Sequence, residues 1–121
     1  IDLAQHVVLG LIAQSGRDWP RAIAEFEQAV ALEDRLAYSE PPYWYYPVRQ
    51  SLGAVLLAAG KLDAAETAFR QSLLRAPNNG WVLYGLAATY QGQGRHAAAA
   101  TASRQFAQAW VGPAAPDLAR L

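Results

Sequence analysis

The chain has 121 residues, of which 53% are hydrophobic and 17% charged, and its ten basic and ten acidic residues balance. This composition supplies enough apolar side chains for one compact domain, and no electrostatic field that would favour nucleic acid or an anionic membrane as a partner. The sequence contains no cysteine, which excludes disulfides and thiolate metal sites but suits the cytosol and the periplasm equally. It also lacks an apolar run of about 18 residues and a basic leader, so we expect neither membrane insertion nor an intact signal peptide.

Capping and helix-breaking residues divide the sequence into six expected helices. Asp2 is a suitable N-cap for a first helix that ends at Ser15-Gly16-Arg17, and Asp18 is a suitable N-cap for a second helix. Pro41 and Pro42 force the second helix to end by about Ser39. Four further helices are expected over residues 50–58, 62–75, 81–93 and 95–110, with Asn79 capping the third of these four. A short helical turn is expected near the C-terminus. The sequence therefore predicts an all-α fold.

The outer face of the second helix is expected to be solvated. It carries Arg21, Glu25, Glu27 and Gln28, which are the residue types of an exposed helix surface. The acidic pair Glu33/Asp34 is interpreted in the same way.

Residues 52–77 recur twice elsewhere in the chain. A shift of 34 residues forward places Gly60 on Gly94 and Ala65 on Ala99, and a shift of 43 backward places Gly53 on Gly10 and Phe69 on Phe26. Self-similarity at such a period is typical of a helical repeat array. The longer shift indicates an insertion between the first and second units.

These residues resemble the tetratricopeptide repeat (TPR), bacterial-type, with three repeats. The resemblance implies one domain of three helix-turn-helix hairpins, stacked as a right-handed α-α superhelix with a short C-terminal helical turn. The units are placed at about 3–34, 46–79 and 80–113, with an aromatic insertion at 37–47 and a tail at 114–121. The third unit departs from the pattern at Ser103 and Phe106.

Gly10 and Gly53 lie inside expected helices, where glycine costs about 1 kcal/mol relative to alanine. Close contact between the two helices of each hairpin is the expected reason. Ala22 and Ala65 are expected opposite these glycines, with Phe26 or Phe69 filling the wider space one turn away.

The resemblance also implies a concave groove lined by the first helix of each hairpin. Its expected lining is apolar, aromatic or amide in character, which favours an apolar or amphipathic peptide or helix and disfavours the acidic tails of chaperones. An alternative is that this surface packs against further repeats. The expected groove residues are Val7, Leu11, Gln50, Ala54, Trp81, Tyr84, Ala88 and Gln91.

The insertion is rich in aromatic residues, which are enriched at binding hot spots. Its side chains would form a contact surface, a lid over the seam between the first two units, or a small-ligand pocket. The residues concerned are Tyr43, Trp44, Tyr45 and Tyr46.

Catalytic chemistry has little support in the sequence. His6 and His96 are the only histidines and lack partners at metal-ligand spacing, and no phosphate loop or nucleophile elbow is present. We therefore expect no enzyme activity, metal or cofactor. The predicted function is a non-catalytic module that binds protein or peptide. The alternatives are a structural segment that extends a superhelix or self-associates through its terminal hairpins, near Trp110, and a small-ligand or enzyme-associated domain that uses the aromatic loop.

Overall fold

The computed structural model describes residues 2–39 and 47–110. Within these ranges the chain forms six helices and no strand, which confirms the all-α prediction. The helices are α1 (Leu3–Ser15), α2 (Trp19–Ser39), α3 (Val48–Ala58), α4 (Leu62–Arg75), α5 (Gly80–Gly92) and α6 (His96–Ala109). The aromatic residues Tyr43, Trp44, Tyr45 and Tyr46 and the expected C-terminal turn lie outside the described residues.

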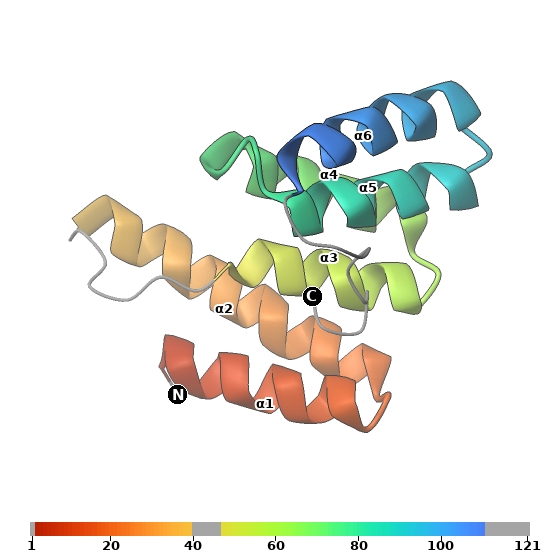
Figure 1. Cartoon of the computed structure of the whole chain (residues 1–121). Coiled ribbons are helices and arrows are strands. Elements are labelled where there is room, and N and C mark those ends of the chain that lie inside the picture. The colour runs from red at the N-terminus through yellow and green to blue at the C-terminus, as the bar shows by residue number, and fades with distance from the viewer. Residues whose placement is uncertain (1, 40–46, 111–121) are drawn as a thin grey trace.

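The helices form three antiparallel hairpins that stack in chain order, from α1 and α2 to α5 and α6 (Figure 1). Each helix packs against the next one in the chain, and α3 also contacts α5. The first helices of the second and third hairpins therefore lie side by side, as in a helical repeat superhelix.

Helix boundaries follow the capping residues closely. The Asp2 carboxylate accepts a hydrogen bond from the Gln5 N–H at 2.9 Å, and the Gln5 side chain accepts one from the Asp2 N–H at 2.8 Å. The Asn79 side chain accepts from the N–H groups of Trp81 and Val82. Both caps satisfy donors that the first turn of a helix leaves free.

The turn inside each hairpin has the same geometry in all three units. Arg17, Gly60 and Gly94 occupy equivalent positions, and each has a positive φ, of 59°, 79° and 75° respectively. A non-glycine residue rarely adopts this left-handed conformation, because its Cβ approaches the backbone. Arg17 is thus a strained variant of a turn that glycine forms in the other two units.

A phenylalanine ring fills the centre of each of the first two hairpins. A Cβ atom added at Gly10 would lie 2.8 Å from the Phe26 ring, and one added at Gly53 would lie 2.6 Å from the Phe69 ring. The close approach is confirmed, but the expected arrangement was wrong in its detail: the ring itself covers the glycine, where an alanine was expected. Gly85 of the third hairpin meets the same Phe69 ring at 2.6 Å. Phe69 therefore packs between two glycines and joins the second hairpin to the third.

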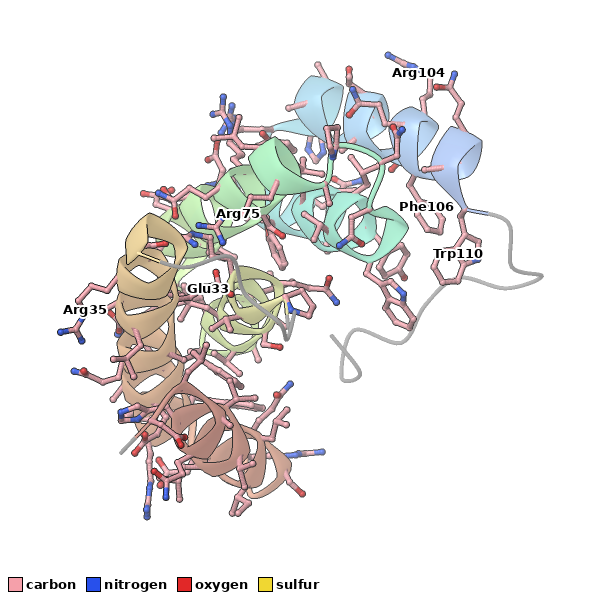
Figure 2. All side chains as sticks on the ribbon, turned by 90° about the vertical axis from the view of Figure 1, so that its left-hand side faces the viewer. Glu33, Arg35, Arg75, Arg104, Phe106 and Trp110 are labelled. Atoms are coloured by element: carbon pink, nitrogen blue, oxygen red, sulfur yellow. The ribbon has the colours of Figure 1, made fainter. Side chains whose placement is uncertain are left out.

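Ion pairs join the first hairpin to the second. Arg49 of α3 and Arg75 of α4 both bind Glu33 and Asp34 of α2, and the shortest distances are 2.6 Å for Arg75 to Glu33 and 2.7 Å for Arg49 to Asp34. Figure 2 shows Glu33 and Arg75 facing each other across this junction. The interpretation of Glu33/Asp34 as an ordinary solvated exterior was wrong, because the next hairpin brings two arginines to this surface.

Glu25 also departs from the expected solvated face. His6 Nδ1 lies 2.7 Å from Glu25 Oε2, and both side chains are largely covered. This contact joins α1 to α2 within the first hairpin.

Candidate functional site

A hollow of about 650 Å³ lies between the C-terminal halves of α1 and α3. We call it the inner hollow. Leu11 and Ala54, two of the expected groove residues, come together in its wall. Its lining is apolar except for the amide of Gln14, the hydroxyl of Ser15 and the guanidinium of Arg17. The lining residues are Leu11, Gln14, Ser15, Arg17, Trp19, Ala54, Leu57 and Ala58.

Four aromatic rings gather at the other end of the array, where α5 begins and α6 ends. Trp81 meets Trp110 edge-on with ring centroids 5.3 Å apart, and Tyr84 meets Phe106 at the same distance. Phe106 and Trp110 stack on each other with ring centroids 5.5 Å apart. Figure 2 shows the two side chains next to each other. We call these four residues the aromatic cluster. Its rings are half-buried, so each is partly accessible to a partner.

The other expected groove residues have different surroundings. Val7 is 4% exposed and belongs to the core, because this side of α1 faces α2. Gln50 is 8% exposed, and its side-chain oxygen accepts a hydrogen bond from Asn79 at 2.9 Å. Ala88 is half-buried, and the exposed Gln91 lies 2.8 Å from the Nδ1 atom of His96. Val7 and Gln50 therefore serve the fold, while Ala88 and Gln91 lie further along α5 than Trp81 and Tyr84 of the aromatic cluster.

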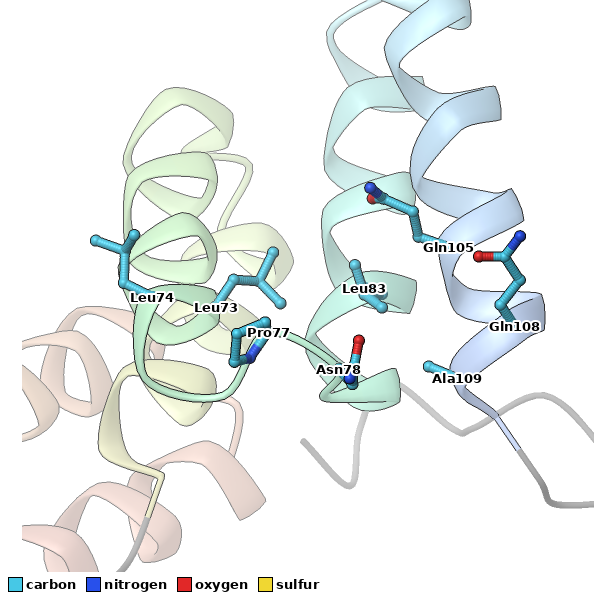
Figure 3. A pocket seen from close by; sticks show the side chains of 8 residues that line it. All are labelled: Leu73, Leu74, Pro77, Asn78, Leu83, Gln105, Gln108 and Ala109. Atoms are coloured by element: carbon cyan, nitrogen blue, oxygen red, sulfur yellow. The ribbon is translucent and has the colours of Figure 1, made fainter.

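A second hollow, of about 770 Å³, opens between the ends of α4 and α6 (Figure 3). We call it the outer hollow. Its lining includes Leu83, Pro77 and Ala109, which are the repeat equivalents of Arg49, Asp34 and Arg75. Small and apolar residues thus replace the ion pairs that close the first junction, and this substitution leaves the second junction open. Leu74, on the rim of the outer hollow, is 85% exposed.

The pKa values of the carboxyl groups at the two junctions are shifted in different directions. Burial raises the pKa of Glu33, and the charges of Arg75 and Arg49 offset this only in part. Hydrogen bonds from Arg49 lower the pKa of Asp34, and burial, which alone would raise this pKa, has a smaller effect. At the second junction burial disfavours the charged form of Glu66, but hydrogen bonds from Gln93, Arg95 and Arg70 together lower its pKa. The charged forms of Asp34 and Glu66 therefore stabilise the array. None of the three carboxylates belongs to the inner hollow or to the aromatic cluster.

Sequence reasoning missed part of both surfaces. Trp19 lines the inner hollow although it opens the second helix. Phe106 on the last helix and Trp110, the C-cap of that helix, complete the aromatic cluster. The departure of the third unit from the repeat pattern at Phe106 was the available signal. Among the described residues, no group of three or more metal-ligating side chains comes together. No helix in the described ranges combines the length and apolar character needed to cross a bilayer.

Comparisons with known proteins agree with this architecture. Residues 56–108 match the tetratricopeptide repeat family. The solved structure of a mutant of the protein MamA superposes on the chain with a TM-score of 0.77, at 24% sequence identity, and covers 91% of this chain and 74% of that chain. No curated protein sequence matches the chain.

Three hairpins with one repeated turn geometry, and a family match over the second and third, define a helical repeat scaffold for protein interaction. The chain has the helical repeat fold of tetratricopeptide repeat proteins, and its residues 56–108 match that family. Proteins with this architecture are typically non-catalytic, and their repeats present an extended surface to other proteins.

Proposed function

We propose that the chain binds an apolar or amphipathic peptide or helix along the inner faces of α1, α3 and α5. The inner hollow is the observation that supports this proposal most strongly. It provides about 650 Å³ lined by Leu11, Leu57 and Trp19, which suits one large apolar side chain of a partner. The aromatic cluster provides a second contact, through Trp81 and Tyr84.

The charges around the inner hollow suggest the character of the partner. Among the residues that the structure describes, Arg17 is the one charged residue in the lining, and no carboxylate of these residues lines the hollow. An apolar anchor followed by an acidic or polar residue therefore matches this site better than a basic segment does. A helix presents such anchors at three- and four-residue spacing.

The experiment selects peptides from a random displayed library on the immobilised chain and measures their affinity by fluorescence anisotropy. Leu11→Asp should weaken binding at least about tenfold, because it places a charge in the wall that receives the anchor. Trp81→Ala should weaken binding to a smaller extent, since its ring also packs on Trp110.

The control is Glu27→Gln on the exposed side of α2, which changes a charge far from either contact and should leave the affinity unaltered. Far-UV circular dichroism establishes that each variant is folded. A selected peptide whose affinity is insensitive to Leu11→Asp and Trp81→Ala, or sensitive to Glu27→Gln, would show that the partner binds elsewhere.

A further inference from the structure

The two ends of the array carry surfaces that the internal junctions bury. Val8 and Ile12 on α1 are 53% and 63% exposed, and no described element covers them. Their equivalents in the second unit are Ser51 and Val55, which are 1% and 0% exposed where α3 packs on α2. We call Val8 and Ile12 the head face.

The third unit repeats this burial. Gly85 and Thr89, the equivalents of Val8 and Ile12, are buried where α5 packs on α4. Gly85 receives the Phe69 ring of the preceding hairpin at 2.6 Å. A first helix in this array is therefore built to receive the second helix of another hairpin at these two positions.

The opposite end offers such a second helix. The equivalent of Phe26 and Phe69 on α6 is Ser103, which is exposed together with Ala100 and Ala107. We call these three residues the tail face. At the second internal junction the Phe69 ring of the second helix is paired in register with the small Gly85 of the next first helix. The repeat equivalents of this pair at the first junction are Phe26 and the small, buried Ser51. At the ends of the described array the small residue is on the second helix and the larger one on the first helix: the tail face presents Ser103 and the head face presents Val8.

We propose that the head face of one copy packs on the tail face of a second copy and continues the superhelix from chain to chain. The small Ser103 on the tail face and the larger Val8 on the head face complement each other, and this complementarity indicates a second copy of the chain as the partner. A second helix with phenylalanine at the register position would overlap Val8, whereas α6, with serine there, leaves room for it. Both faces are apolar or small, and burying Val8 and Ile12 is favourable in proportion to the apolar area removed from water.

The junction should be weak and insensitive to salt. Internal junctions also contain ion pairs, such as Arg95 to Glu66 at 2.8 Å. The equivalents of Glu66 and Arg95 across a head-to-tail contact are Ala100 and Asp18, which form no ion pair. Association is therefore expected to be reversible, and unchanged or strengthened at high salt.

Head-to-tail contact is heterologous, so assembly need not stop at the dimer. In sedimentation velocity across a concentration series, the mass of the chain should rise from 13.1 kDa past twice that value without a plateau at the dimer. Ile12→Asp on the head face and Ser103→Arg on the tail face should each keep the chain monomeric. A mixture of the two variants should form a dimer that grows no further, because one intact head meets one intact tail.

Two further variants test the register. Ser103→Phe should weaken association about tenfold, and adding Val8→Ser to the same chain should restore it by recreating the pairing of Phe with a small residue. Leu74→Ser, on the rim of the outer hollow, and Leu11→Asp, in the inner hollow, should leave association unchanged. Leu11→Asp also separates this proposal from peptide binding, which that variant should weaken.

The proposal is overturned by a constant mass of 13.1 kDa at every concentration, by a plateau at the dimer, or by a mixture of the two blocked variants that stays monomeric. It is equally overturned if Leu74→Ser abolishes association while Ile12→Asp, shown to be folded by circular dichroism, does not.

Discussion

The Phe69 ring is confined between two helices, so a larger residue at Gly53 is expected to destabilise the fold. A Cβ at Gly53 would lie 2.6 Å from one side of the ring, and a Cβ at Gly85 would lie 2.6 Å from another part of it. Movement of the ring away from Gly53 is thus opposed by the backbone of α5. Overpacking of this kind costs about 1–3 kcal/mol, while alanine in place of a helical glycine returns up to about 1 kcal/mol. Gly53→Ala should therefore lower the free energy of unfolding by about 1–2 kcal/mol.

The matched control is Gly16→Ala. Gly16 has a φ of −85°, and an added Cβ would meet nothing closer than 3.8 Å, so this change should be neutral or slightly stabilising. A second test combines Gly53→Ala with Phe69→Leu, which shortens the side chain that causes the overlap. The cost of Gly53→Ala should be smaller in the Phe69→Leu background, because residues in contact are not energetically additive.

Urea unfolding followed by far-UV circular dichroism measures the free energy of unfolding of the wild type and of the four variants. The reasoning is refuted if Gly53→Ala and Gly16→Ala have equal stability, or if Gly53→Ala costs the same with Phe69 and with Leu at position 69.

Three further predictions concern stability. Arg17→Gly should raise the free energy of unfolding by about 0.5–1 kcal/mol, because it relieves a positive φ that the equivalent glycines adopt freely; an unchanged urea midpoint would argue against strain. Arg49→Leu should cost about 1–3 kcal/mol by leaving Glu33 and Asp34 with one arginine, whereas Arg70→Leu, at an exposed pair, should cost under about 1 kcal/mol. The pKa values of Asp34 and Glu66 are lower in the folded protein, so their stabilisation is present above the ordinary carboxyl pKa and is lost as the pH falls below about 4. Glu66→Gln should reduce that acid sensitivity in unfolding curves recorded at several pH values.

Helix bounds could be predicted from sequence because the signals that set them are local. Asp2 and Asn79 cap the helices that they precede, and the predicted helix over residues 62–75 is α4. The predicted helix over 50–58 begins two residues earlier, at Val48, because Pro47 immediately precedes the first turn. The repeat spacing likewise revealed the close approach at Gly53, since a buried glycine at a repeated position requires a neighbour.

Contacts between hairpins could not be predicted in the same way. The partners of Glu33 and Asp34 are Arg49 and Arg75, and Arg75 is more than 40 residues away in the chain. Their meeting depends on how one hairpin is rotated against the next, which repeat spacing does not specify. The same rotation decides that Val7, Gln50 and Ala54 are buried, while Leu11 is exposed in the wall of the inner hollow. Side-chain type identified the inner faces as candidates, but only the packing distinguishes the core from the wall of the groove.

The central claim is that a partner binds at the inner hollow, and a nuclear magnetic resonance titration tests it most directly. The ¹⁵N-labelled chain is titrated with a peptide selected on the wild-type protein, and the indole N–H signal of Trp19 reports on the lining of the hollow. The account predicts that this signal and the amides of Gln14 and Leu57 shift most, while the amides of Glu27 and Arg70 on the second helices stay in place. Large shifts at Glu27 and Arg70 with an unmoved Trp19 indole would contradict it.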